Sequence, residues 1–288
     1  MSSEAEGRFH ILDVSSLTSV HRRVPRRRML RTDDGVRIEA VYEPSVASVT
    51  DTAVTPVTDT AAVLDTAVVL AHGFTGSVDR PAVRRAARAF AERGASVVTF
   101  SFRGHGGSGG RSTVGDREVL DLSAAVRWAR ELGHARVVTV GFSMGGSVVL
   151  RHAALEAGGA GAVDAVAAVS APARWYYRGT APMRRLHWVV TRPEGRLVGR
   201  YGLGTRIDRR AWDPVPLSPV EAVPLIAPVP LLIVHGDRDA YFPLDHPRAL
   251  AAAGGDAAEL WLEPGMGHAE NAADAALLAR LGDWLVGG

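Results

Sequence analysis

The sequence predicts an α/β domain in which a mostly parallel sheet carries helices on both faces. Short apolar segments alternate with longer helix-like segments along most of the chain, which is the pattern of repeated strand–helix–strand units. The strand-like segments are apolar throughout, as is typical of strands that are buried on both faces. The chain has 288 residues, of which 47% are hydrophobic and 22% are charged, so it is long enough and apolar enough to bury a sizeable core.

The N-terminal part is predicted to contain an arm, a hairpin and a loop. Residues 1–28 show no sustained hydrophobic period, so we interpret them as a loosely ordered arm before a single domain over residues 29–288. The arm ends in three arginines, a pattern typical of a solvated charge run that would also suit a phosphate or an anionic membrane. Asp34-Gly35 is a strong turn signal within a hairpin expected over residues 29–43. Residues 44–65 contain VTDTA twice and are predicted to form an elongated surface loop.

The strand–helix pattern continues beyond this loop. The pattern is interrupted at residues 171–229, which we interpret as a short lid insertion into the domain. Strands are predicted at residues 67–71, 95–102, 135–140, 163–170, 230–235 and 259–262, and helices at residues 81–93 and 116–132, from residue 144 onward, at residues 246–253 and at the C-terminus.

The composition excludes several classes of chemistry. Without cysteine there is no disulfide, thiolate nucleophile or thiolate metal site. All 33 basic residues are arginine, which excludes a lysine Schiff base and a P-loop. No histidine pair has metal-ligand spacing beside a glutamate, so neither a metal nor another cofactor is expected.

The same composition bears on location and partners. No run of eighteen apolar residues and no export signal is present, so we expect a cytoplasmic protein without stable membrane insertion. The pI is 9.4 but the net charge is only +2, which argues against a nucleic-acid partner. The sequence carries no signal for an oligomeric state.

Two segments match the pattern Gly-any-Ser-any-Gly, and only one has the context of a nucleophile. Gly141–Gly145 follows a predicted strand directly and leads into a helix without proline. A sharp turn between strand and helix exposes a serine hydroxyl above the sheet edge. Ser108 also matches, but it lies about six residues past its strand in a glycine-rich loop. Ser143 is therefore the predicted nucleophile.

A serine nucleophile needs a general base and a group that orients the base. His268 lies in a glycine loop just after a predicted strand, and Asp239 lies just after another. Both would reach the carboxyl edge of a parallel sheet, where such sheets place their ligands. Asp237 is a rival for the acid. The histidines His72, His105 and His235 also lie in glycine loops, where we expect them to hold loops together.

The chain resembles the α/β-hydrolase superfamily in five motifs that occur in the same order. They are HGFTGS at residues 72–77, FRGHGGS at 102–108, GFSMGG at 141–146, HGDRDAYFP at 235–243 and GMGH at 265–268. The resemblance covers about residues 30–288 and is greatest to esterases, lysophospholipase-like enzymes and serine aminopeptidase-like hydrolases.

This resemblance implies the α/β-hydrolase fold and a catalytic triad of Ser143, Asp239 and His268, with Asp239 preferred over Asp237. It also implies an oxyanion hole formed by the backbone N–H groups of Phe74 and Met144. The short lid argues against a large interfacial lid, and the 44–65 connection is longer than this resemblance leads us to expect.

The expected function is hydrolysis of a carboxylic ester or thioester of a small-molecule acyl substrate through an acyl-enzyme intermediate. Peptide or amide hydrolysis and cofactor-free perhydrolysis use the same triad, and a non-catalytic ligand sensor of the same fold is a further alternative. Residues 171–229 hold six Trp and Tyr residues and ten arginines against four acids. The aromatic residues are suited to line an apolar pocket, and the arginines are suited to attract an anionic substrate. The alternative is that the aromatic residues pack the lid onto the body of the domain and the arginines face water.

Overall fold

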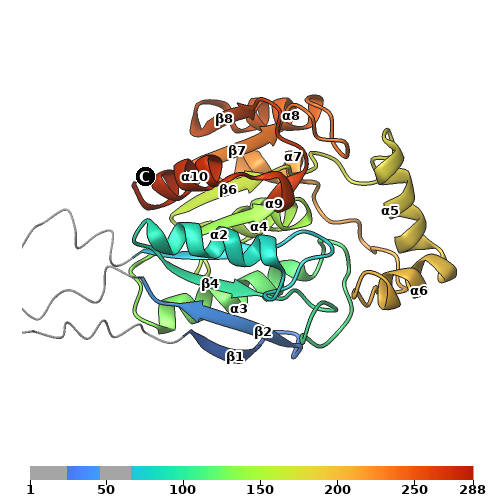
Figure 1. The fold of residues 1–288 in the computed structure, drawn as a ribbon, viewed down its shortest axis with the longest axis horizontal. Coiled ribbons are helices and arrows are strands. Elements are labelled where there is room, and N and C mark those ends of the chain that lie inside the picture. Colours follow the sequence, from blue (N-terminus) through green and yellow to red (C-terminus); the bar gives the residue numbers. More distant parts are fainter. Residues whose placement is uncertain (1–24, 46–65, 288) are drawn as a thin grey trace, which may run out of the picture.

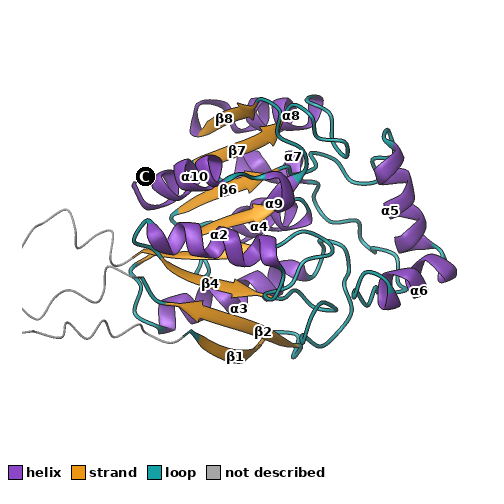
Figure 2. Cartoon of the chain, viewed as in Figure 1, coloured by secondary structure: helices purple, strands orange, loops and turns teal. Residues whose placement is uncertain are grey.

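The computed structural model describes residues 25–45 and 66–287, which form an eight-stranded sheet with helices on both faces (Figure 1, Figure 2). The strand order is β1-β2-β4-β3-β5-β6-β7-β8. The strands from β3 to β8 run parallel, and β2 pairs antiparallel with both of its neighbours, β1 and β4. The predicted fold class is therefore confirmed. The strands are β1 (Arg26–Arg31), β2 (Arg37–Glu43), β3 (Thr66–Ala71), β4 (Ser96–Phe100), β5 (Arg136–Phe142), β6 (Ala165–Val169), β7 (Leu231–Gly236) and β8 (Ala258–Glu263).

Helices cover the two faces of the sheet and enclose two apolar cores. Helices α2 and α10 pack on one face, and α3, α4 and α8 pack on the other. The described helices are α2 (Pro81–Glu92), α3 (Glu118–Glu131), α4 (Met144–Leu155), α5 (Ala181–Thr191), α6 (Pro193–Tyr201), α7 (Pro219–Ala222), α8 (Asp245–Gly254), α9 (Ala269–Ala272) and α10 (Ala275–Gly287), with short 3-10 turns at η2 (Val223–Leu225) and η3 (Gly255–Ala257).

Strand β3 shows why the apolar runs form this sheet. Its side chains alternate between the two cores, with Ala67, Val69 and Ala71 on one side and Val68 and Leu70 on the other. All five are fully buried. Burial on both faces therefore explains why this run of five residues is apolar throughout.

The first strand begins three residues earlier than predicted. Residues 26–28, assigned to the arm from the sequence, pair with β2 in antiparallel register. Two of the three arginines form ion pairs: Arg27 with Glu39 and, at 2.8 Å, with Asp79, and Arg28 with Glu131 at 3.6 Å. These three residues were not predicted to be part of the strand, because the exposed edge of the sheet requires no hydrophobic period. The rest of the predicted arm and the loop at 46–65 lie outside the described residues.

The insertion between β6 and β7, residues 171–229, holds α5, α6, α7 and η2. Helices α5 and α6 lie beyond the carboxyl ends of the parallel strands, apart from the helices that cover the sheet (Figure 1). We call residues 171–229 the insertion segment; its role as a lid stays a prediction. No described helix has the length and hydrophobicity to cross a membrane.

Candidate active site

Ser143 occupies a strained turn between β5 and α4. Its φ of 53° and ψ of −114° lie in a region that non-glycine residues seldom adopt. The two flanking glycines are required by close backbone packing. A Cβ atom on Gly141 would lie 2.2 Å from the carbonyl oxygen of Gly145, and one on Gly145 would lie 2.2 Å from that of Ala71. The turn therefore selects the glycine spacing that the sequence shows.

A continuous hydrogen-bonded chain links Ser143, His268 and Asp239. The Nε2 atom of His268 lies 2.8 Å from the Oγ atom of Ser143, and its Nδ1 atom lies 2.7 Å from Oδ2 of Asp239. Ser143 follows β5, Asp239 follows β7 and His268 follows β8, so three separate strand ends bring the groups together. This arrangement has the geometry of a nucleophile, a base and a group that orients the base.

Asp239 is held in one orientation by backbone donors. Its Oδ1 atom accepts hydrogen bonds from the N–H groups of Tyr241 at 2.7 Å and Phe242 at 3.1 Å, which leaves Oδ2 for His268. The carboxyl group is fully buried, and burial alone would raise its pKa. The hydrogen bond from His268, the electrostatic attraction to that imidazole and the two backbone donors together outweigh burial, so the pKa of Asp239 is lowered. Asp239 is therefore ionised at neutral pH.

Aromatic rings enclose the imidazole of His268. The ring of Tyr241 stacks on it with a centroid separation of 4.2 Å, and the ring of Phe242 meets it edge-on at 5.6 Å. The side chain of His268 stays 18% exposed. The ring is thus fixed in position while its Nε2 side remains open to Ser143 and to a ligand.

The rival residues have other partners. Asp237 accepts a hydrogen bond from the N–H of Gly265 at 2.6 Å and so holds the turn before His268. Ser108 is buried, accepts from the N–H of Glu39 and donates to the carbonyl oxygen of Ser101. Neither reaches the chain formed by Ser143, His268 and Asp239.

The loop after β3 presents the N–H of Phe74. The Nε2 atom of His72 accepts from the N–H of Phe102 at 3.0 Å, so Nδ1 carries the proton and donates to the carbonyl oxygen of Gly73 at 2.6 Å. Burial, followed by the charge of His105, lowers the pKa of His72 to about 3 and keeps this ring neutral. Because the peptide is planar and trans, a Gly73 carbonyl held by His72 turns the N–H of Phe74 to the opposite side.

Within the described residues, the N–H groups of Phe74 and Met144 have no protein acceptor. The N–H of Met144 is at the first position of α4, where helices leave amide donors free and carry a partial positive charge. Both predicted oxyanion donors are thus free to meet a ligand.

Glu270 is a residue near the site that the sequence did not single out. Its side chain lies beside Gly73 and accepts the N–H of that residue at 3.1 Å. The residue is only 6% exposed. The one available signal is its position two residues after His268. Only the tertiary packing of α9 against the loop after β3 reveals the contact.

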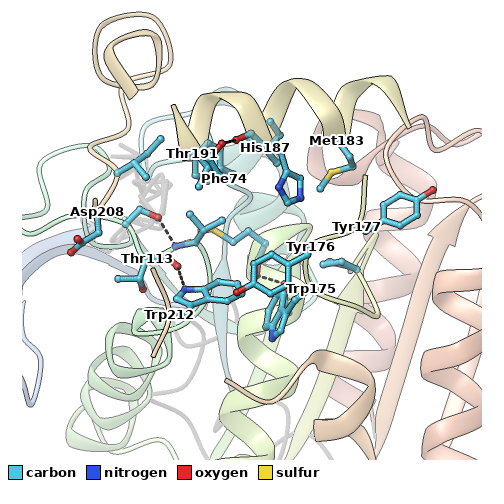
Figure 3. Close-up of a pocket in the computed structure, with 18 of the residues that line it drawn as sticks. Phe74, Thr113, Trp175, Tyr176, Tyr177, Met183, His187, Thr191, Asp208 and Trp212 are labelled. Atoms are coloured by element: carbon cyan, nitrogen blue, oxygen red, sulfur yellow. Dashed lines mark hydrogen bonds between the residues drawn. The ribbon is translucent and has the colours of Figure 1, made fainter. Parts of the chain in front are cut away.

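A cavity of about 410 Å³ extends from Ser143 beneath the insertion segment. Figure 3 shows Trp175, Tyr176 and Trp212 gathered at one side, while Met183 and His187 descend from α5. Trp175 and Trp212 meet edge-to-face at 5.1 Å, with Tyr176 at 5.5 Å from Trp212. The volume lies within the range of small-molecule pockets.

Two of these aromatic side chains are held by the backbone. The Nε1 atom of Trp212 donates to the carbonyl oxygen of Thr113 at 2.7 Å, and that of Trp175 donates to the carbonyl oxygen of Pro216 at 2.9 Å. These two indole rings are therefore held in place at the wall of the cavity. Across residues 25–45 and 66–287, no cluster of three or more potential metal-ligating side chains occurs.

Comparisons with known proteins agree with this architecture. Residues 66–196 match the family model described as "alpha/beta hydrolase fold". A stretch of 108 residues is 37% identical to the putative esterase YheT of Escherichia coli, covering 36% of this chain and 32% of that protein. The match thus spans about a third of the curated relative.

Solved structures of esterases share the fold. The esterase Pf2001 of Pyrococcus furiosus superposes with a TM-score of 0.67 at 22% identity, over 91% of this chain and 92% of that chain. An esterase domain from a Rhodothermus marinus protein gives a TM-score of 0.60 at 20% identity, over 92% and 97% of the two chains. Together with the sheet topology, the match over residues 66–196 shows that the chain has the α/β-hydrolase fold and that it resembles esterases.

Proposed function

We propose that this protein hydrolyses carboxylic esters or thioesters, with Ser143 as nucleophile, His268 as general base and Asp239 as the acid that orients the base. The observation that carries the proposal is the chain of two short hydrogen bonds, 2.8 Å from His268 to Ser143 and 2.7 Å from His268 to Asp239. The similarity to esterases supports the same reaction class.

In the first half of the reaction, the Oγ atom of Ser143 attacks the acyl carbon while Nε2 of His268 takes its proton. The carbonyl oxygen becomes negatively charged and accepts hydrogen bonds from the N–H groups of Phe74 and Met144. Each such donor is typically worth about 3 kcal/mol in the transition state. The ionised Asp239 stabilises the imidazolium that forms.

Collapse of this tetrahedral intermediate breaks the bond to the leaving group. His268 returns the proton to the departing alkoxide or thiolate, and the acyl group remains on Ser143. His268 then removes a proton from water, which attacks the acyl-enzyme. As the bond to Oγ of Ser143 breaks, His268 gives this proton back to Oγ, so that the carboxylic acid leaves and the free enzyme is restored. The cavity beyond Ser143 accommodates the small-molecule acyl substrate.

The test combines activity with covalent labelling. Ser143→Ala is expected to lower kcat on 4-nitrophenyl esters by about 10⁴-fold or more, because nucleophile and base act as one unit. A fluorophosphonate probe should label the parent protein and leave Ser143→Ala unlabelled. Ser108→Ala, which changes the other serine of the same sequence pattern, should keep both activity and labelling. Equal ester hydrolysis by the parent and Ser143→Ala would refute the proposal.

The alternatives predict different results in the same experiment. Stoichiometric labelling without turnover of any ester would favour a ligand sensor of this fold. Cleavage of anilides at rates comparable to those of matched esters would favour an amide hydrolase, because anilides are intrinsically much less reactive. Peroxide-dependent acyl transfer would favour a perhydrolase. The cytoplasmic location and the absence of a nucleic-acid partner remain predictions from the sequence.

A further inference from the structure

The insertion segment carries a charge opposite to that of the rest of the protein. It holds ten arginines and four acids, which gives a formal charge of +6. The whole chain has a formal charge of +2, so the remainder carries −4. The positive charge is therefore concentrated on the segment that covers the cavity.

The arginines of this segment are also unlike the others in their partners. In the described part of the chain, ten arginines outside the segment form ion pairs with carboxylates. Within the segment, one arginine does so: Arg174 pairs with Asp245 at 2.5 Å. The positive charge of the segment is thus largely left without acidic partners among the described residues.

Five of these arginines line the cavity: Arg174, Arg178, Arg196, Arg209 and Arg210. Two of them are anchored within the segment itself, with Nε of Arg196 donating to the carbonyl oxygen of Val190 at 2.9 Å and Nε of Arg178 lying 3.3 Å from Nδ1 of His187.

Arg209 and Arg210 differ from these in having free guanidinium groups. Among the described residues, neither group has a hydrogen-bond or ion-pair partner. Asp208 is the one carboxylate among the described lining residues, and its Oδ1 atom accepts the backbone N–H of Arg210 at 2.9 Å. A guanidinium presents paired N–H donors that match a carboxylate or a phosphate group.

The arginines share this cavity with apolar walls. Trp175 and Trp212 pack edge-to-face at 5.1 Å, and Met183 and Leu186 of α5 line the same space. Such walls favour an apolar chain, whereas unpaired guanidinium groups favour an anionic group on the same molecule. The two features together fit an amphiphilic ligand.

We propose that the cavity binds anionic amphiphiles, an apolar acyl chain joined to a carboxylate or phosphate group, and that Arg209 and Arg210 bind the anionic group. As a statement about substrate, this inference rests on the proposed ester hydrolysis. As a statement about binding, it is independent of turnover. The anion site lies on the insertion segment, apart from the N–H groups of Phe74 and Met144.

The test measures binding to Ser143→Ala, so it does not depend on catalysis. Isothermal titration calorimetry compares decanoate with 1-decanol, two chains of equal length that differ in the anionic group. Decanoate is expected to bind about tenfold more tightly at low salt, because charge-assisted hydrogen bonds are stronger than neutral ones. This preference should shrink when NaCl is raised from about 50 mM to about 500 mM, since salt screens exposed charges.

Arginine variants on the Ser143→Ala background locate the anion site. Arg209→Gln with Arg210→Gln should remove most of the preference for decanoate. The matched control is Arg185→Gln with Arg192→Gln, which changes the same charge on exposed arginines of the segment that do not line the cavity. The control should keep the preference.

Three outcomes would overturn the proposal. The first is equal binding of decanoate and 1-decanol. The second is a preference for decanoate that survives in the Arg209/Arg210 variant, which would place the carboxylate at the backbone amides near Ser143. The third is an equal loss of this preference in the control variant, which would indicate a diffuse charge effect. If the preference follows Arg209 and Arg210 while the parent protein hydrolyses no ester, the proposed function fails and the binding site stands.

Discussion

Replacing Asp239 with asparagine tests the orientation of the proposed base with the smallest possible change in shape. The backbone N–H groups of Tyr241 and Phe242 both donate to Oδ1 of Asp239. In Asp239→Asn the amide oxygen must take this position, because its NH₂ group cannot accept those donors. The NH₂ group then faces Nδ1 of His268, which accepts and leaves the proton on Nε2. In that tautomer His268 cannot take the proton of Ser143.

The expected loss follows from the two interactions that change. The charge-assisted hydrogen bond between Asp239 and His268 contributes about 1.5–3 kcal/mol. In Asp239→Asn, returning His268 to the active tautomer, with the proton on Nδ1, makes two donors face each other in a buried site and costs about 1–3 kcal/mol. Together these terms predict a fall in kcat of about 10²- to 10⁴-fold. Stability should change little, because Asn keeps both backbone hydrogen bonds.

The assay is hydrolysis of 4-nitrophenyl esters, with thermal unfolding followed by circular dichroism as a check on folding. Asp237→Asn is the matched control, since it is the same substitution two residues away, at a group that binds the N–H of Gly265. We expect the control to keep activity within a few-fold of the parent. A loss below tenfold in Asp239→Asn, or a larger loss in Asp237→Asn, would refute this assignment of the acid.

Three further predictions concern stability, each measured by urea unfolding. The pKa values of His72 and His152 are lowered to about 3 and about 4, mainly by burial, so the unfolded chain binds more protons than the folded protein below pH 6.5. The contribution of these neutral histidines to the free energy of unfolding is complete above that pH, and it falls by up to about 1.4 kcal/mol per pH unit per histidine toward pH 4. His152→Leu should make this decline in stability shallower. A free energy of unfolding that stays constant between about pH 7 and pH 5 would contradict the reasoning. Gly145→Ala should lower the free energy of unfolding by about 2–3 kcal/mol or more, because the new Cβ would lie 2.2 Å from a backbone carbonyl oxygen. A loss of stability below about 0.5 kcal/mol would show that the turn can relax. Arg103→Met should cost about 3–5 kcal/mol, because the 3%-exposed guanidinium pairs with two carboxylates and one of them is fully buried. An Arg103→Met variant as stable as the parent would mean that these carboxylates are neutral without their partner.

Local signals in the sequence were sufficient for the sheet and for the tight turn at Ser143. Apolar runs such as residues 67–71 predict strands, because a strand between two helical layers is buried on both faces. Ser143 is marked by the strand before it and the helix after it, and the structure shows that its flanking glycines have no room for a Cβ atom. These features depend on neighbours along the chain.

The resemblance favoured Asp239 over Asp237, and long-range contacts give the two residues different partners. The two residues are two positions apart in the same loop, and only the register of that loop against the turn before His268 separates their roles. The start of the first strand, residues 26–28, escaped prediction for a related reason. Its arginines carry no hydrophobic period, and the strand forms because β2 offers an unpaired edge and nearby carboxylates pair with Arg27 and Arg28.

The sequence by itself determined the fold class and the residues that follow each strand end, because burial in a parallel sheet leaves a clear pattern along the chain. The tertiary structure alone decided which of those residues meet. It brought His268 within 2.8 Å of Ser143 across 125 residues, buried Glu270 beside Gly73, and arranged five arginines around one cavity. The physical reason is that hydrogen-bond partners and cavity walls are set by distances in space between separate segments, and hydrophobic periodicity encodes only which face of each segment is buried.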